Sequence, residues 1–271
     1  MLRKLIKHDF IATWKVPVSL DAALIVLGIL TAVVISTIPH TTESLGMSIF
    51  MFSFVGLYYI GIIAANVVTI IYLVIRYYKN LYTSEGYLTF TLPVKTDMII
   101  HSKVITGAAW LFLSYVSTFI SIMIAGSGFI KTVNISREEL MTAFTEMTSF
   151  MGLDDPGFRM ILILMVLITP IAGVLCMYFC ISIGQLWQEH KVLGAILCII
   201  GLHILNQLLS QVAFLGSGFW QLMTSSPDNI DASFGHVYRN MFAIIMVITI
   251  IQAIIYYAVC LIINRKKINL D

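Results

Sequence analysis

Hydrophobic residues in this chain gather into six long runs separated by more polar segments. Each run is at least as long as the roughly 20 mostly apolar residues that a helix needs to cross a bilayer. Because unpaired backbone polar groups are costly in lipid, each run is predicted to be an α-helix. The pattern therefore predicts an all-α integral membrane protein with six transmembrane helices. The predicted spans are residues 18–38, 49–75, 102–130, 158–184, 192–214 and 241–263.

The charged residues between the runs separate by side. Twelve of the 16 Lys and Arg residues lie before the first run, between the second and third, between the fourth and fifth, or after the sixth, if Lys103 at the start of the third run is counted with them. The alternate segments, with Arg159 at the start of the fourth run, hold four basic and eight acidic residues. By the positive-inside rule, both termini are predicted to be cytoplasmic. The net charge of +2 conceals this asymmetry, and without a basic stripe bearing interleaved aromatics the chain is not expected to bind nucleic acid.

Residues 1–16 form an amphipathic stretch ahead of the first run. Apolar side chains recur there at helical spacing, and basic side chains occupy the remaining face. This pattern predicts a helix that lies in the inner membrane interface. A basic tail that only sets the topology is the alternative. Pro17 is expected to end the helix, since proline cannot continue the backbone hydrogen-bond ladder.

The segment 76–103 is the most distinctive predicted cytoplasmic connection. It carries aromatic and apolar residues among charges, which is typical of a surface that docks a partner protein. The same residues also suit an aromatic belt in the headgroup layer, and composition does not separate the two interpretations. The aromatic and apolar set comprises Tyr82, Tyr87, Leu88, Phe90 and Leu92.

Two longer segments are predicted on the outer side. Residues 131–157 are expected to contain a short helix, because Ser136 and Glu139 have the spacing of a capping box. The apolar face of this helix would lie on the outer leaflet, cover the mouth of a pathway, or pack over the ends of the spans. Asp155 belongs to a turn ahead of the fourth span. Residues 215–238 are predicted to form a loop or a short re-entrant piece.

The chain lacks the motifs of several enzyme classes. It contains no Gly-x-x-x-x-Gly-Lys-Ser/Thr run, so it is not expected to bind ATP through a P-loop, and no His-Glu-x-x-His motif of zinc proteases. All four cysteines lie inside predicted spans, where they are interpreted as small apolar residues rather than disulfide partners or zinc ligands. We expect no catalytic residue, no metal site and no cofactor in this chain.

The polar residues inside the spans are nearly all neutral. They suit the lining of a pathway, or hydrogen bonds between helices of one copy or of a dimer. Asp21, the one carboxylate in a span, lies near its predicted cytoplasmic end, whereas ion-coupled carriers usually place ionisable groups near the midplane. The driving energy is therefore expected to come from outside the chain. The candidates for a pathway lining are Asn66, His203, Asn206, Gln207 and Gln211.

Two cytoplasmic stretches resemble a known family. Residues 78–82 read Tyr-Lys-Asn-Leu-Tyr and residues 85–94 read Glu-Gly-Tyr-Leu-Thr-Phe-Thr-Leu-Pro-Val, which resembles the cytoplasmic loop of bacterial ABC exporter permeases of the type 2 class. Residues 5–10 resemble the opening interfacial helix of these permeases, and the six-span topology is similar along the whole chain. The resemblance implies a single permease domain over residues 1–271, in the bacterial cytoplasmic membrane.

The resemblance also implies protein partners. Two permease copies would pair, as a homodimer in the simplest assembly, and each would bind a separate ATPase subunit that holds ATP and Mg. The loop after the second span would carry the coupling helix, and the connection 185–191 would make a second ATPase contact. ATP-driven closure of the ATPases would open the pathway outward. The residues implied in this coupling are Tyr82, Glu85, Gly86, Tyr87, Leu88, Trp187 and Glu189.

The implied substrate is an amphipathic or antimicrobial peptide. The chain is similar to permeases that export phenol-soluble modulins and lantibiotic-type peptides, and an apolar pathway suits a substrate with an apolar face. Export of a lipid or a small-molecule drug is an alternative, as are a stand-alone carrier or channel and a membrane scaffold or sensor. Besides the ATPase, the expected partners are a second copy of the chain and membrane lipid.

Overall fold

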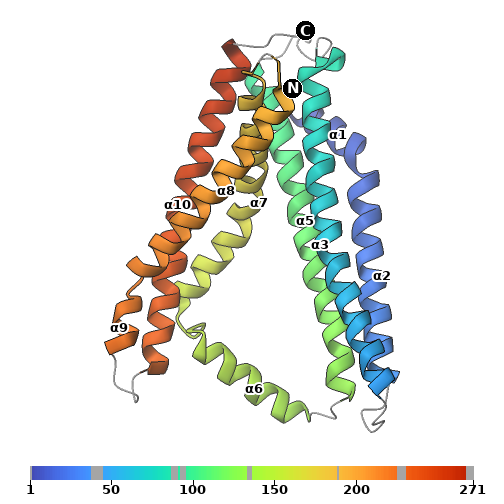
Figure 1. Cartoon of the computed structure of the whole chain (residues 1–271), viewed down its shortest axis with the longest axis vertical. Helices are drawn as coiled ribbons and strands as arrows, with labels where there is room; N and C mark the ends of the chain where they lie inside the picture. Colours follow the sequence, from blue (N-terminus) through green and yellow to red (C-terminus); the bar gives the residue numbers. More distant parts are fainter. Residues whose placement is uncertain are drawn as a thin grey trace. The chain divides into compact units, whose positions relative to one another are not determined.

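The computed structural model describes residues 2–37, 45–86, 91, 96–132, 136–187, 189–224 and 230–266. Within these ranges all regular secondary structure is helical. The helices, in chain order, are α1 (Leu2–Thr13), α2 (Lys15–Thr37), α3 (Leu45–Tyr82), α5 (Thr96–Thr132), α6 (Arg137–Phe150), α7 (Pro156–Gly184), α8 (Lys191–Gly216), α9 (Phe219–Thr224) and α10 (Ile230–Lys266) (Figure 1).

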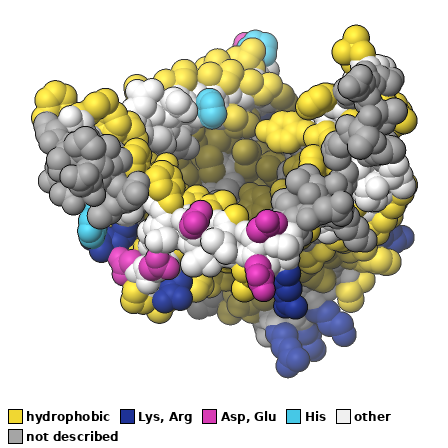
Figure 2. Space-filling model, turned by 90° about the horizontal axis from the view of Figure 1, so that it is seen from below, with side chains coloured by type: hydrophobic (Ala, Val, Ile, Leu, Met, Phe, Trp, Pro, Cys, Tyr) yellow, Lys and Arg dark blue, Asp and Glu magenta, His cyan; other side chains and the backbone are white. Residues whose placement is uncertain are grey.

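Six of these helices are long and apolar enough to cross a membrane, namely α2, α3, α5, α7, α8 and α10. This confirms the predicted all-α, multi-pass architecture. Large hydrophobic side chains remain exposed along these helices, among them Phe52, Ile60 and Leu208, and contact with lipid would cover such surfaces. Figure 2 shows hydrophobic side chains over much of the visible surface, with several acidic side chains among them.

Three helices extend well beyond the apolar runs, and α10 does so most, because it begins at Ile230 whereas the sixth span is predicted to start at residue 241. α3 continues to Tyr82, past the predicted end of the second span at residue 75, and α5 begins at Thr96, ahead of the predicted start at residue 102. Much of the segment 76–103 is therefore helix. The apolar pattern marks only the part of a helix that suits lipid, whereas polar residues such as Lys79 continue a helix equally well outside it. Asp97 in the first turn of α5 complements the partial positive charge of that helix end.

The chain breaks between α1 and α2 at Trp14, three residues before Pro17. Pro17 lies inside the first turn of α2 and is buried. A proline ring excludes the hydrogen bond to the carbonyl group four residues earlier, which here belongs to Thr13, the last residue of α1. The proline accounts for the break as predicted, but the break falls ahead of it.

The helices pack as two compact units. Unit 1 comprises Met1–Tyr77 and His101–Leu140, and unit 2 comprises Tyr78–Ile100 and Met141–Asp271. The boundaries fall inside α3, α5 and α6 rather than between elements. The last turn of α3 and the first turn of α5 therefore belong to unit 2, whereas the rest of both helices belongs to unit 1. The structure thus gives two packing units that share helices, and the single permease domain stays a prediction.

In unit 1, α2 and α5 approach closely where both carry small residues. A Cβ built on Gly28 would lie 2.5 Å from Ser121 Oγ and 2.9 Å from the Ser121 carbonyl oxygen. A Cβ on Gly128 would lie 2.7 Å from the carbonyl oxygen of Ala32. Small residues at such crossings allow the close packing that drives helix association in lipid, where no hydrophobic force pulls helices together.

Gly28→Ala is expected to destabilise unit 1 by about 1–3 kcal/mol, because the added methyl group meets the backbone of Ser121. Gly126 is the matched control, since it also lies in a membrane-length helix and a Cβ there meets nothing within 4 Å. Gly126→Ala should be neutral or slightly stabilising. Thermal unfolding in detergent compares the two variants with the wild type. Equal midpoints for both variants would contradict the tight α2–α5 contact.

In unit 2, α10 packs mainly against α7. The rings of Phe158 and Phe242 have centroids 5.7 Å apart, and those of Phe179 and Tyr256 are 4.8 Å apart. These aromatic pairs join the two helices at separate levels along their length. At the end of α7, Gly184 allows α8 to approach, because a Cβ there would lie 2.6 Å from the carbonyl oxygen of the first residue of α8.

The predicted capping box begins α6. The Ser136 amide donates to Glu139 Oε2 at 2.9 Å, and the Glu139 amide donates to Ser136 Oγ at 3.1 Å. The helix ends in a Schellman motif at Gly152, whose φ of 73° favours glycine. In this motif the Leu153 amide donates to the carbonyl oxygen of Thr148 at 2.9 Å. Both ends of α6 are therefore specified by local sequence.

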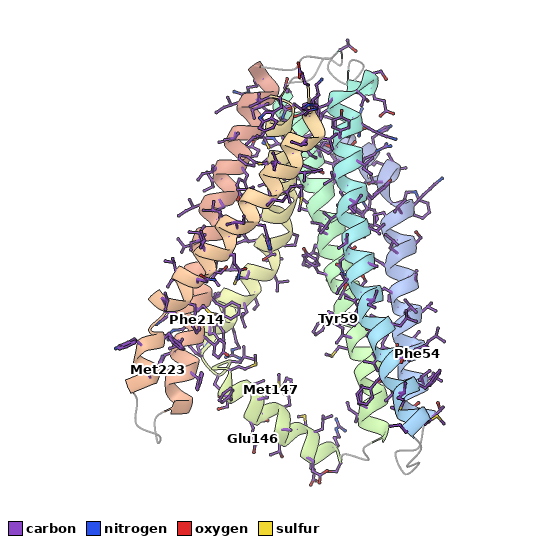
Figure 3. All side chains as sticks on the ribbon, viewed as in Figure 1. Phe54, Tyr59, Glu146, Met147, Phe214 and Met223 are labelled. Atoms are coloured by element: carbon purple, nitrogen blue, oxygen red, sulfur yellow. The ribbon has the colours of Figure 1, made fainter. Side chains whose placement is uncertain are left out.

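No side chain of α6 is buried. The apolar residues Phe144 and Met147 are exposed, and Met147 and Glu146 point to different sides of the helix (Figure 3). This exposure does not support packing over the ends of the spans along most of α6. At its last residue the helix does contact α10, because the ring centroids of Phe150 and Phe234 lie 5.5 Å apart. The outer-leaflet and pathway-mouth interpretations of this helix stay predictions.

The predicted outer segment 215–238 contains the short helix α9. Ser217 and Gly218 separate α9 from α8, and Gly218 has a φ of 97°. The rings of Phe214 and Phe219 lie 4.5 Å apart across this turn. The first part of the segment is thus a helical turn packed on the end of α8, and residues 225–229 lie outside the described ranges. From residue 230 onward the segment is helix and belongs to α10, so the prediction of a loop or re-entrant piece is wrong there.

Asp155 caps α7 and joins it to α10. Its carboxylate accepts a hydrogen bond from the Gly157 amide at 2.9 Å and forms an ion pair with Arg239 of α10, also at 2.9 Å. The hydrogen bond from Arg239, and after it the one from Gly157, lowers the pKa of Asp155 below its usual value. The predicted turn before the fourth span therefore also connects two helices of unit 2.

Asp155→Asn keeps the capping acceptor and removes the charge that pairs with Arg239. Because the pKa of Asp155 is lowered in the fold, its stabilising contribution is complete above the usual pKa of 3.8 and is lost as pH falls through the folded-state pKa. The variant should therefore unfold at a lower temperature than the wild type near neutral pH, and this gap should close in acid. Thermal scans across pH, with Asp154→Asn as the control of equal charge change, measure it. A gap that persists in acid would contradict the assignment.

Candidate functional site

A buried polar cluster ties the end of α3 to α7 and α10 in unit 2. The Tyr82 hydroxyl donates to Asn264 Oδ1 at 2.8 Å and lies 3.0 Å from Ser182 Oγ. The Asn264 Nδ2 donates to the carbonyl oxygen of Cys260 at 2.8 Å, within α10. We call Tyr82, Ser182 and Asn264 the Tyr82 cluster.

The Tyr82 cluster is almost completely excluded from solvent. Ser182 is 0% exposed, Asn264 1% and Tyr82 7%, and the neighbouring Leu81 is 0% exposed. A buried polar group that loses its partner costs about 1–3 kcal/mol. The hydrogen bonds of the cluster therefore favour one register of the end of α3 against α7 and α10.

The first turn of α5 is held on the same part of α10 by an ion pair. The Arg265 guanidinium donates through Nε to Asp97 Oδ1 at 2.8 Å and through Nη2 to Asp97 Oδ2. Ile99 and Ile100 of α5 are buried beside this end. Asn264 and Arg265 are adjacent residues. Both ends of the segment between α3 and α5, residues 83–95, are therefore attached to one turn of α10, and we call residues 83–95 the tethered segment.

The predicted coupling residues of the tethered segment differ in their surroundings. Tyr82, just before it, is buried, so any part it plays in coupling is to hold the segment rather than to touch a partner. Glu85 is exposed. Gly86 is buried, and its amide donates to the Thr83 carbonyl oxygen at 2.7 Å in a tight turn. The other two predicted coupling residues, Tyr87 and Leu88, lie outside the described ranges.

The second predicted contact segment starts beside the Tyr82 cluster. Ser182 lies two residues before the end of α7 at Gly184, and the connection to α8 follows. The Trp187 side chain is 48% exposed, and its ring covers Gly194, on which a Cβ would lie 3.2 Å from the indole. Glu189 is exposed and lines a shallow groove along the first turns of α8. The two segments predicted to contact an ATPase therefore begin at one end of unit 2.

The predicted pathway residues divide between the two units. In unit 1, Asn66 Nδ2 donates to Thr118 Oγ1 at 3.1 Å, and in unit 2 the Gln252 Nε2 donates to Asn206 Oδ1 at 2.8 Å. Asn66 and Asn206 thus make hydrogen bonds between helices, as the alternative interpretation expects. The remaining candidates are exposed on one face of α8, four residues apart: His203, Gln207 and Gln211. Polar side chains in the middle of a membrane-spanning helix usually face protein or water rather than lipid.

A row of hydroxyl groups along α5 joins α2 and α3 in unit 1, and no sequence motif predicts it. Asp21 Oδ1 accepts hydrogen bonds from Ser114 Oγ at 3.0 Å and from Ser117 Oγ at 2.9 Å. One turn further along α5, Ser121 Oγ lies 2.9 Å from the Tyr58 phenol oxygen. The signal in the sequence is the helical spacing of four hydroxyl residues at positions 114, 117, 118 and 121 on one face of the third span.

The cysteines are free thiols inside the membrane-length helices α7, α8 and α10. The Cys260 Sγ lies 3.8 Å from Ser182 Oγ, next to the Tyr82 cluster. Across the ranges that the structure describes, no group of three or more His, Cys, Asp or Glu side chains is arranged to hold a metal ion.

No family model matches the chain, and no curated protein or solved structure matches it. The chemistry of the site is therefore read from its own residues. The hydrogen bonds of the Tyr82 cluster and the Asp97–Arg265 pair join the ends of neighbouring helices. Together these contacts fix both ends of the tethered segment to α10.

Proposed function

We propose that this chain is the membrane permease subunit of an ATP-driven exporter of the type 2 ABC class. The observation that carries the proposal is the attachment of both ends of the tethered segment to Asn264 and Arg265. Through Ser182 the attachment also includes α7. A partner that displaces the tethered segment would therefore act on α3, α5, α7 and α10 together. Conformational switching between two states requires such a link between the partner's binding site and the packed helices that move.

A partner supplies the energy for transport in this proposal. The sequence holds no P-loop. Away from the helix ends, the membrane-length helices as described offer one carboxylate, Asp21, whose Oδ1 already accepts two serine hydroxyls. Two ATPase subunits that bind ATP and Mg would contact the tethered segment and the connection between α7 and α8. Their closure would pull on α3 and α5, which continue from unit 2 into unit 1.

The assembly in this proposal lies in the bacterial cytoplasmic membrane, with both termini on the cytoplasmic side where the basic residues gather. The second permease copy supplies partners for the exposed polar face of α8, since polar side chains are the usual hydrogen-bonding contacts between helices in lipid. The substrate class is an amphipathic peptide. Exposed Phe144 and Met147 on α6 give the outer segment an adaptable apolar surface that suits such a substrate.

An ion-coupled carrier is the second candidate, and Asp21 is the observation that favours it. A carboxylate held by two hydroxyl groups inside a membrane helix has the composition of a cation or proton site. Asp21→Asn distinguishes the two functions. A carrier that uses Asp21 would lose transport, whereas ATP-driven export should persist. Transport measured in vesicles with ATP, and with an ion gradient in its place, gives the answer.

Glu85→Ala combined with Tyr87→Ala tests the ATPase contact. The tagged chain, gently solubilised from the membranes of its own host, should carry a bound protein that hydrolyses ATP at one copy per permease, and the double change should remove it. Glu146→Ala combined with Tyr59→Ala replaces the same residue types at exposed positions elsewhere (Figure 3) and should leave the ATPase bound. Equal retention of the ATPase by both variants would contradict the proposed contact.

A further inference from the structure

The helix α1 has one face fixed against protein. Its single acid, Asp9, accepts hydrogen bonds from the side chains of Ser102 and Lys103 of α5. The ring of Phe10 stacks on Trp110 with centroids 4.4 Å apart, and Thr13 Oγ1 accepts a hydrogen bond from the Trp110 indole at 2.9 Å. All these contacts lie within unit 1. The apolar stripe predicted to lie in the membrane interface thus packs in part on α5, and this packing sets which face of α1 points away.

The opposite face of α1 mixes cations with apolar side chains. Arg3, Lys7 and Ile11 follow one another at intervals of four residues, and Lys4 and Trp14 flank them. All five are exposed, Ile11 by 59% and Trp14 by 46%. Within the described ranges, none of the three cations forms an ion pair or a side-chain hydrogen bond. We call these five residues the basic face of α1.

We propose that the basic face of α1 binds the headgroups of anionic phospholipids. The membrane-length helix α2 begins one residue after Trp14, which places the basic face at the level where the chain enters lipid. Cations beside exposed Trp and Ile side chains are the combination that binds an anionic membrane surface, with the apolar groups inserted between headgroups. This inference does not depend on the proposed transport function.

An anionic lipid accounts for both the cations and the exposed apolar side chains of the basic face. An acidic protein or a nucleic acid would neutralise Arg3, Lys4 and Lys7 but would leave Ile11 without an apolar environment. A zwitterionic bilayer would cover Ile11 and Trp14 but would not neutralise the cations. Because Asp9 is already paired with Lys103, the helix itself offers no counter-charge to the three cations. The charge complementarity therefore favours a lipid with a net negative headgroup.

Lipid titration of the purified full chain tests this proposal. Native mass spectrometry from detergent counts the molecules of phosphatidylglycerol and of phosphatidylcholine that the chain retains. The triple variant Arg3→Gln, Lys4→Gln and Lys7→Gln should weaken phosphatidylglycerol retention by about 100-fold, roughly fivefold for each cation. Binding of phosphatidylcholine should not change, and added salt should weaken only the phosphatidylglycerol complex.

The matched control neutralises three cations outside α1, with Arg137→Gln, Arg159→Gln and Lys191→Gln. This control should keep the retention of the wild type. An equal loss of phosphatidylglycerol retention in both triple variants would overturn the proposal, because the net charge of the chain alone would then account for lipid binding. Equal retention of the two lipids by the wild type, or tighter binding of an RNA oligomer than of phosphatidylglycerol, would overturn it as well. The single change Lys7→Glu serves if the triple variant does not fold, and it should also reduce phosphatidylglycerol retention.

Discussion

Asp9→Ala is expected to lower the free energy of unfolding by about 3–5 kcal/mol. The Asp9 carboxylate accepts a hydrogen bond from the Ser102 hydroxyl at 2.6 Å and pairs with the Lys103 ammonium at 2.5 Å. The side chains of Asp9 and Lys103 are only 13% and 12% exposed. Without this carboxylate, the Lys103 charge stays in a place that water reaches poorly. The contact between α1 and α5 in unit 1 should loosen as a result.

A double variant separates two contributions to this loss of stability: the loss of the ion pair itself, and the cost of keeping the Lys103 charge in a poorly hydrated place. Asp9→Ala combined with Lys103→Met removes both charges and should recover much of the stability that Asp9→Ala loses, since the cost of burying the ammonium disappears as well. Thermal unfolding in detergent of the wild type, the single variant and the double variant measures this recovery. If the double variant were less stable than Asp9→Ala, the pair would not be the cause of the loss.

Tyr82→Phe is expected to destabilise unit 2 by about 1–3 kcal/mol and to impair coupling. The change deletes the hydroxyl group that donates to Asn264 and is hydrogen-bonded to Ser182, and it leaves the aromatic ring in place. Asn264 and Ser182 are buried, so water does not easily replace the lost partner. The end of α3 would then be held less firmly on α7 and α10. In the proposed exporter, the partner ATPase would still bind, but less transport would follow each ATP hydrolysed.

Tyr78→Phe is the control for this prediction. Tyr78 lies one turn earlier in α3, with its ring centroid 6.1 Å from that of Tyr82, and within the described ranges its hydroxyl makes no hydrogen bond. The change should leave both stability and the ratio of transport to ATP hydrolysis unaltered. Thermal unfolding and the two rates, measured on one preparation, test both parts. An unchanged ratio in Tyr82→Phe, despite the loss of stability, would show that the Tyr82 cluster is structural only.

The sequence predicts those features that local residues specify. The six spans follow from apolar runs that lipid requires to be helical. The start of α6 follows from Ser136 and Glu139, and the turn at Asp155 from residues next to it. The predicted bounds of α3, α5 and α10 are wrong at one end each, because Tyr82, Asp97 and Ile230 lie outside the apolar runs, where hydropathy carries no information on helix continuation.

The Tyr82 cluster and the hydroxyl row of α5 were not predicted, because they depend on which helices become neighbours. Ser182 and Asn264 are 82 positions apart, and nothing near either residue indicates that both will meet Tyr82. The hydroxyl row had a visible spacing in the third span, yet its partner Asp21 lies on another helix. Long-range pairing of this kind decides which polar residues line a pathway and which ones join helices.

ATP-dependent peptide uptake tests the central claim most directly. Inside-out membrane vesicles that contain the chain and its partner ATPase would be given a fluorescent amphipathic helical peptide. The exporter proposal predicts accumulation with Mg-ATP, no accumulation with a non-hydrolysable analogue, and loss of accumulation on Glu85→Ala combined with Tyr87→Ala. Accumulation that follows an ion gradient without ATP, or no difference from vesicles that lack the chain, would contradict it.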